Sequence, residues 1–218
     1  MRQHAAARPF TLVELIVVMG VMILLAAIAI PAYSSLFSGR KTTLAANQVN
    51  GAVMEARTHA VSSKIYTALV FVKDNVVNGY TSIRMAEVYH NPDTENNSYL
   101  WRRWVPGVAF TVLPENTMIP ASGKEFLGTT SSLESKVGTG ELTKVANLSN
   151  SGLTGISTAP AIIFKPNGQL AGTGEDNVVM LFVETNRFQA NASRTPKLPL
   201  NINWLTCKTK FLDPAPVQ

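Results

Sequence analysis

Ligands for metals and thiols for disulfides are scarce in this sequence. It has one cysteine, Cys207, and three histidines in 218 residues. One cysteine excludes an intrachain disulfide, and dispersed histidines do not provide the clustered nitrogen and sulfur ligands of a zinc site. The adjacent acids Glu175 and Asp176 are too few to hold Ca²⁺. We therefore expect no metal and no other cofactor.

Sequence motifs of the common enzyme classes are also missing. There is no His-Glu-x-x-His helix and no Gly-x-Ser-x-Gly elbow. The stretch AGTGED (171–176) lacks the third glycine of a dinucleotide loop, and Gly123-Lys124 is followed by glutamate where a phosphate-binding loop has Ser or Thr. We expect a protein without enzymatic activity.

Charge is sparse as well. Only 15% of the residues are charged and 46% are hydrophobic, a composition that excludes a disordered chain. The formal net charge of +5 includes Arg2 and Arg8 near the N-terminus. The remaining excess of positive charge permits an anionic partner but does not indicate one. The length suits one domain with an N-terminal anchor.

The longest uncharged apolar run extends from Leu15 to Ala32. As a helix, these residues would cover about 27 Å, close to the thickness of a bilayer core. Glu14 stands immediately before the run. An ionisable side chain beside lipid is unfavourable by a few kcal/mol, so we expect Glu14 to have a partner and a function.

Two general interpretations of this N-terminal segment give Glu14 no role. In a secretory signal peptide, Arg2 and Arg8 would form the basic region, and Ala27-Ile28-Ala29 the cleavage site. In a plain single-pass anchor, the same two arginines would keep the N-terminus in the cytoplasm.

A third interpretation follows from the sequence PFTLVEL, residues 9–15. It resembles the prepilin signature of type IV pilins and type II secretion pseudopilins, in which a basic leader is cut before Phe and the fifth mature residue is Glu. The resemblance implies cleavage between Pro9 and Phe10, N-methylation of Phe10, and a role for Glu14 in assembly. The family usually has glycine before the cut, where this chain has Pro9, and Pro31 falls where many members carry a helix-kinking proline.

The same resemblance implies a set of partners and a location. Glu14 would pair with the α-amine of Phe10 in a neighbouring subunit, a strong interaction where the dielectric constant is low. The partners would be other pilin or pseudopilin subunits, the prepilin peptidase, the assembly platform and the inner membrane. The subunit would be a single-pass inner-membrane protein with its globular domain facing the periplasm, and would enter a filament on assembly.

Apolar residues recur at steps of three and four from Leu44 to Val61, which predicts an amphipathic helix over Lys41–Ser62. With the apolar run it would form one long helix, kinked at Pro31. The expected organisation is a leader (1–9), an N-terminal helix (10–62, with 15–33 transmembrane) and a β-rich domain (63–218).

The β-rich part has two hairpin signals, Asn78-Gly79 and Pro166-Asn167-Gly168. Three stretches resemble the GspH/FimT group of minor pseudopilins and pilins: the helix and strand LAANQVNGAVMEARTHAVSSKIYTALVFV (44–72), the hairpin IIFKPNGQL (162–170) and the closing strand NWLTCKTKF (203–211). The range 90–158, rich in Gly, Ser and Thr, is expected to be a variable insertion with one or two short strands. The predicted fold class is α+β and type IV pilin-like: a long kinked helix packed on an antiparallel domain. Further strands are expected at 108–113, 177–185 and 202–212.

The segment YLWRRWVPG, residues 99–107, is the candidate partner surface. Trp101 and Trp104 with Arg102 and Arg103 could stack on bases and pair with phosphates, or form a subunit contact. The third alternative is an ordinary strand with one Trp inward and solvated arginines.

The sequence thus predicts a minor pseudopilin or pilin-like filament subunit. The alternatives are a DNA-binding minor pilin and a simple membrane-anchored envelope protein.

Overall fold

The computed structural model describes residues 11–73, 79–92, 99–120, 136–137, 142–171, 178–190, 195, 197–203 and 205–212, with only the backbone described over 28–39 and 136–137. The chain divides into two compact units, Met1–Arg40 and Lys41–Gln218. Pro9 and Phe10, the predicted cleavage site, lie outside the described residues.

One helix, α1 (Leu12–Ser63), is 52 residues long and has a defined cap at each end. At its start, the Glu14 amide donates a hydrogen bond to Thr11 Oγ1 (3.2 Å), as an N-cap threonine provides. At its end, Lys64 adopts a left-handed conformation (φ 54°) and the Ile65 amide donates to the Ala60 carbonyl (3.3 Å). This is the Schellman arrangement, which satisfies the last carbonyls of a helix.

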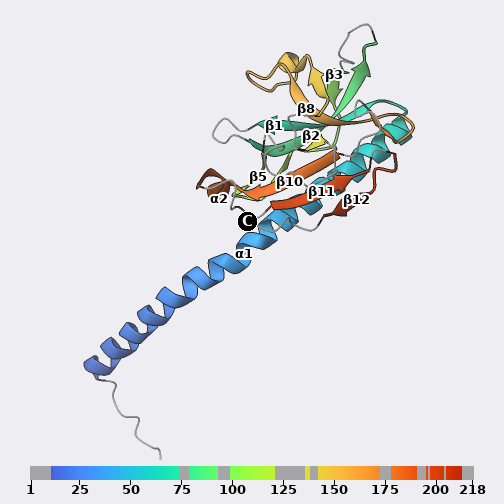
Figure 1. Cartoon of the computed structure of the whole chain (residues 1–218). Coiled ribbons are helices and arrows are strands. Elements are labelled where there is room, and N and C mark those ends of the chain that lie inside the picture. Colours follow the sequence, from blue (N-terminus) through green and yellow to red (C-terminus); the bar gives the residue numbers. More distant parts are fainter. Residues whose placement is uncertain are drawn as a thin grey trace, which may run out of the picture. The chain divides into compact units, whose positions relative to one another are not determined.

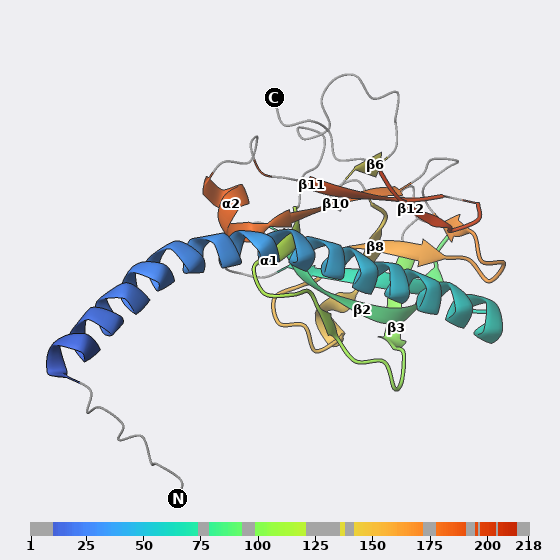
Figure 2. The same ribbon diagram turned by 90° about the horizontal axis from the view of Figure 1, so that it is seen from below.

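The part of α1 within the second unit is amphipathic, as predicted. Its buried side chains follow helical spacing: Ala45, Ala46, Val49, Val53, Ala56 and Ala60. Leu44 and Val61, which were expected on the apolar face, are instead about half exposed (52% and 47%). The predominance of alanine on the buried face allows the helix to pack closely on the sheet (Figure 2).

Besides α1, the described residues of the second unit form a mixed sheet of 12 strands. Figure 1 shows its longer strands. Its strands are β1 (Thr67–Lys73), β2 (Gly79–His90), β3 (Tyr99–Trp104), β4 (Thr111–Val112), β5 (Thr117–Pro120), β6 (Lys136–Val137), β7 (Lys144–Ala146), β8 (Ala159–Phe164), β9 (Leu170–Ala171), β10 (Val178–Glu184), β11 (Lys197–Ile202) and β12 (Thr209–Phe211). Among the described residues of this unit, the 3₁₀ helix η2 (Leu148–Asn150) and the helix α2 (Thr185–Ala190) lie between strands.

Five strands of this sheet pair in a closed ring, in the order β1–β8–β7–β3–β2 and back to β1. The ring closes through a parallel pairing of only two residue pairs, Tyr99 with Val145 and Leu100 with Ala146. The ring's core is rich in small residues, which suits the narrow interior of a ring with so few strands. Its members are Ala68, Val70, Ala86, Val88, Tyr99, Val145, Leu148, Ala159, Ala161, Ile163 and Ala171.

A second, larger core lies between α1 and the sheet. Alternate residues of β1, β2 and β8, such as Phe71, Met85 and Phe164, point away from the ring's core and pack with the alanine face of α1. β10 and β11 extend this core with Phe182 and Leu200. β1, β2 and β8 therefore have apolar residues on both faces, and α1 packs on one of these faces.

The predicted fold class is wrong. The sheet is mixed rather than antiparallel, because β3 pairs parallel to β7 and β6 pairs parallel to β10, and part of it closes into a ring. The helical conformation continues through Pro31 without interruption, so the predicted kinked helix is not found. Proline removes one backbone donor, and the hydrogen bonds of the flanking turns suffice to maintain the helix. Within the described part of the chain, no helix is sufficiently long and apolar to cross a membrane.

The local predictions for the β part had mixed outcomes. β8 and β9 form the hairpin expected at Pro166–Gly168, with Gly168 at φ 82°. β1 pairs antiparallel with β2 as expected, although Asn78 lies outside the described residues. The single strand expected over 202–212 is wrong. A turn separates β11 from β12. In this turn Asn203 Oδ1 accepts hydrogen bonds from the amides of Leu205 and Thr206 (3.1 and 2.9 Å).

Candidate functional site

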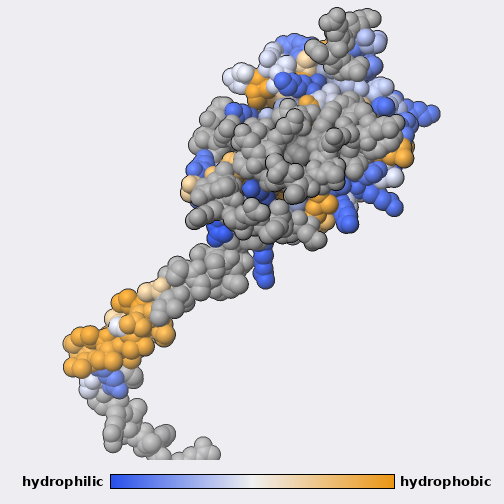
Figure 3. All heavy atoms as spheres, viewed as in Figure 1, coloured by the Kyte–Doolittle hydropathy of each residue, from blue (hydrophilic) through white to orange (hydrophobic). Residues whose placement is uncertain are grey.

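The first described turns of α1 have exposed apolar side chains, and Figure 3 shows one face of this surface. The large hydrophobic residues between Leu12 and Leu25 are each 45–76% exposed. Glu14 is the only ionisable residue in this stretch. A surface of this kind is far more apolar than the scattered exposed residues of an ordinary globular surface, and it marks an interaction site.

Glu14 has a local structural role that the sequence reasoning missed. Thr11 and Glu14 are three residues apart, which is the spacing of a capping box. The Thr11 hydroxyl accepts a hydrogen bond from the Glu14 amide. A carboxylate in the first turn also interacts favourably with the positive end of the helix dipole. The signal, Thr-x-x-Glu before an apolar run, was present in the sequence. This cap explains how the first turn of the helix is stabilised. It does not explain the exposed apolar surface that follows.

The second candidate surface is β3, where the structure separates the two tryptophans from the two arginines. Trp101 and Trp104 stand opposite Val88 and Ala86 and pack with the ring's core. Arg103 stands opposite Glu87, and Arg102 is the additional residue of a β-bulge at this point of the pairing. Without the bulge, the residues of β3 would alternate and each face would receive one Trp and one Arg.

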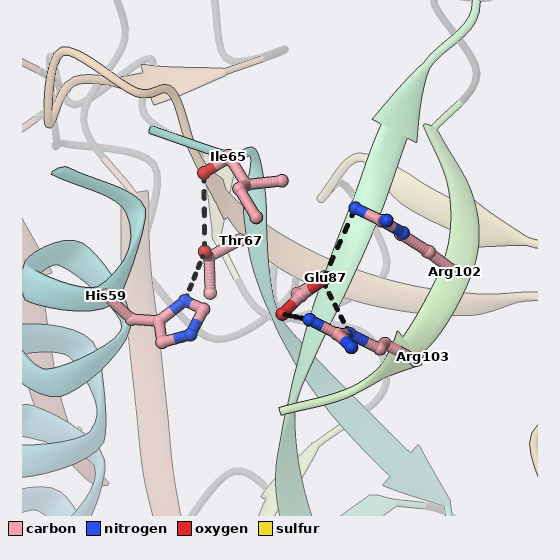
Figure 4. A network of polar contacts seen from close by, with 6 residues as sticks. All are labelled: His59, Ile65, Thr67, Glu87, Arg102 and Arg103. Carbon is pink, nitrogen blue, oxygen red and sulfur yellow. Dashed lines mark hydrogen bonds and ion pairs between the residues drawn. The ribbon is translucent and has the colours of Figure 1, made fainter. Parts of the chain in front are cut away.

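Glu87 is the anion that both arginines share (Figure 4). Its side chain is 2% exposed, and it accepts two hydrogen bonds from Arg103, at 2.8 Å from Nε and 2.9 Å from Nη2. Arg102 Nη1 lies farther away, at 3.7 Å. The hydrogen bonds from Arg103 hold the pKa of Glu87 below its usual value, against the opposing effect of burial, and the nearby positive charges lower it further.

A polar contact between α1 and β1 adjoins this ion pair. Thr67 is paired with Glu87 across the strands, and its hydroxyl lies 3.1 Å from His59 Nδ1 of α1 (Figure 4). The same hydroxyl donates to the Ile65 carbonyl at 3.5 Å. Together these contacts connect the last turns of α1 to β1, β2 and β3. Their role is therefore structural.

The two tryptophans lie in a different environment. Their ring centroids are 5.8 Å apart, and Trp104 Nε1 donates to the Ser151 carbonyl (2.6 Å). The guanidinium of Arg84 lies over the Trp104 ring (4.4 Å) and over the Phe110 ring (4.5 Å). Burial lowers the pKa of Arg84.

The part of the chain that the structure describes contains no cluster of three potential metal ligands. Cys207 is fully buried, and its thiol donates to the Gly168 carbonyl (3.1 Å). Burial raises the pKa of this thiol, which disfavours the reactive thiolate.

No protein-family model matches the chain, and neither a curated protein nor a solved structure matches it. A pilin-like identity therefore stays a prediction, based on residues 9–15 and the apolar run that follows them.

Sequence reasoning missed Glu87 and Arg84 altogether. Both stand in a strand of ordinary composition, and no motif surrounds them. Their importance follows from tertiary neighbours, namely Arg103 of β3 for Glu87 and the rings of Trp104 and Phe110 for Arg84.

Proposed function

We propose that the chain is a non-enzymatic, minor pseudopilin-like subunit of a type II secretion or type IV pilus-type filament, which assembles through the first half of α1. The observation that carries the proposal is the exposed apolar surface between Leu12 and Leu25, with one carboxylate, Glu14, at its start. Burial of this surface against other helices or lipid is favourable. The proposal does not rely on the fold of Lys41–Gln218, which departs from the expected pilin-like domain.

In this proposal the prepilin peptidase cuts between Pro9 and Phe10, and Glu14 pairs with the new α-amine of a neighbouring subunit. An unpaired carboxylate among apolar helices would be strongly disfavoured, so the pairing fixes the axial position of one subunit relative to the next. Before assembly the subunit resides in the inner membrane, a location that fractionation of cell membranes tests directly.

The first experiment is intact-mass measurement and N-terminal sequencing of the full chain recovered from cell membranes. A mature protein that starts at Phe10, with the added mass of an N-methyl group, supports the proposal. A start at Met1 contradicts it, and a start near Ser34 indicates ordinary signal-peptide cleavage. Because proline lacks an N–H and has a fixed φ, Pro9→Gly should increase the cleaved fraction if the peptidase acts here.

The second experiment tests the role of Glu14 in assembly. Glu14→Gln should leave cleavage intact and strongly reduce the amount of the chain in sheared filaments. Glu55→Gln is the matched control, because Glu55 is an exposed glutamate of α1 outside the apolar stretch. Equal incorporation of both variants would remove the proposed pairing.

A further inference from the structure

Arg84 of β2 is a half-buried cation held by aromatic rings. Its guanidinium carbon lies 4.4 Å from the centroid of Trp104 and 4.5 Å from that of Phe110. The two ring centroids are 6.3 Å apart, so the rings cover two adjacent sides of the guanidinium. Cation–π contacts of this kind fix the position of the group without neutralising its charge.

The positive charge of Arg84 has no anionic partner within the described residues. Its Nε is buried and donates no hydrogen bond, and no described carboxylate forms an ion pair with it. A buried N–H group in a protein normally has a hydrogen-bond partner, because the loss of hydration is otherwise uncompensated. Glu87, the buried acid of the same strand, is already bound by Arg103 on the opposite face of the sheet.

The surface around Arg84 is apolar and exposed. Ser82 of β2 is paired with Val112 of β4, and Phe110 lies two residues before Val112. Alternation along the strands places Ser82, Arg84 and Val112 on one face of the sheet, opposite to the α1-packed face of Ile83. Phe110 is 39% exposed and Val112 is 65% exposed.

We propose that Arg84 is a binding site for a carboxylate carried by a protein segment, with an apolar side chain next to that carboxylate packing on Phe110 and Val112. A guanidinium binds a carboxylate through two parallel hydrogen bonds, which also satisfies its unpaired donors. A nucleic acid fits less well, because it needs a row of cations along its phosphates. Here Arg84 lies against the rings of Trp104 and Phe110, while Arg102 and Arg103 lie on the other face of the sheet.

The test uses the full chain in detergent with ¹⁵N-labelled arginine, and the probes are the peptides acetyl-Leu-Glu-Leu-amide and acetyl-Leu-Gln-Leu-amide. The expected result is a shift of the Arg84 Nε–H resonance with the Glu peptide and at least about tenfold weaker binding of the Gln peptide, as expected when a charge-assisted hydrogen-bonded pair is lost. Arg84→Gln should weaken binding of the Glu peptide by a similar factor. Arg102→Gln, on the opposite face of the sheet, is the matched control and should leave binding unchanged.

Two further measurements keep the test decisive. Arg84→Lys retains the charge and stem but not the two-pronged geometry, so it should weaken binding in a chain whose circular dichroism and thermal unfolding remain normal. Titration with inorganic phosphate distinguishes the source of the anion. Phosphate binding as tight as that of the Glu peptide would overturn the protein-segment assignment, and equal responses to both peptides would overturn the carboxylate site. The inference is independent of the proposed filament function.

Discussion

Replacing Glu87 by glutamine tests whether the shared carboxylate stabilises the contact between β2 and β3. The substitution keeps the size and shape of the side chain and removes its charge. In the unsubstituted protein, Arg103 donates two hydrogen bonds to the Glu87 carboxylate. In Glu87→Gln the amide oxygen can accept one of them, while the amide NH₂ faces a second donor and cannot accept.

The expected decrease in the free energy of unfolding follows from this number of hydrogen bonds. A hydrogen bond to a charged group contributes about 1.5–3 kcal/mol, and one of the two bonds is lost while the other becomes weaker. The side chains of Arg102 and Arg103 are 41% and 55% exposed, so solvent screening reduces this loss and hydration stabilises their unpaired charge. We expect Glu87→Gln to lower the free energy of unfolding by about 1–2 kcal/mol, which corresponds to a decrease in Tm of about 3–6 °C for a chain of this length.

The pH dependence of the Tm difference distinguishes the effect of the Glu87 charge from the effect of side-chain packing. The pKa of Glu87 is lowered in the folded state, chiefly by the hydrogen bonds from Arg103. Its stabilisation is therefore complete above the ordinary glutamate pKa of about 4.3 and is lost as the pH falls through the lower folded value. Thermal unfolding of the full chain in detergent, followed by circular dichroism, should show a Tm difference at pH 7 that shrinks below about pH 4. The reasoning is refuted by an unchanged Tm at pH 7, or by a difference that persists undiminished at pH 3.

The remaining predictions concern three backbone and side-chain features. Gly168→Ala should lower the free energy of unfolding by about 1–3 kcal/mol, because Gly168 is at φ 82° and a new Cβ would meet an α1 side chain at 3.0 Å. Gly152→Ala, at φ 84° with open space around it, should cost less in the same thermal unfolding assay. Thr11→Val should remove the cap on the Glu14 amide and destabilise the first turn by about 1 kcal/mol, seen as faster hydrogen exchange there. Cys207 should resist a thiol reagent at pH 8 until the chain is denatured, because burial raises its pKa; rapid labelling of the native chain would contradict its placement.

Local signals in the sequence predicted the elements that depend on local interactions. The helical spacing between Lys41 and Ser62 identified the amphipathic half of α1, and Pro166-Asn167-Gly168 identified a hairpin. In each case the information lies within a few residues, in the periodicity of apolar side chains or in a position that requires a positive φ. Strand β10 was likewise evident from its continuous apolar run.

The closed ring could not be predicted in the same way. It depends on the parallel pairing of Tyr99 with Val145 and Leu100 with Ala146, between segments more than 40 residues apart in a range that has the composition of a loop. Part of the range 90–158, expected to be a variable insertion, supplies β3 and β7 to this ring. Pairings so short and so distant in sequence leave no periodic signal, because two or three residues cannot establish an alternation.

The β-bulge at Arg102 explains why one sequence motif yields two separate surfaces. Regular alternation would have mixed the residue types on each face, whereas the extra residue directs both arginines to Glu87 and both tryptophans to the ring's core. A base-stacking platform needs rings and cations together on one exposed face. The arginines of β3 are instead engaged with a buried acid of their own chain, and the cation that does accompany Trp104 is Arg84 from the neighbouring strand. The charge of Arg84 is instead framed by the rings of Trp104 and Phe110, which favours one carboxylate of a protein partner over a chain of phosphates.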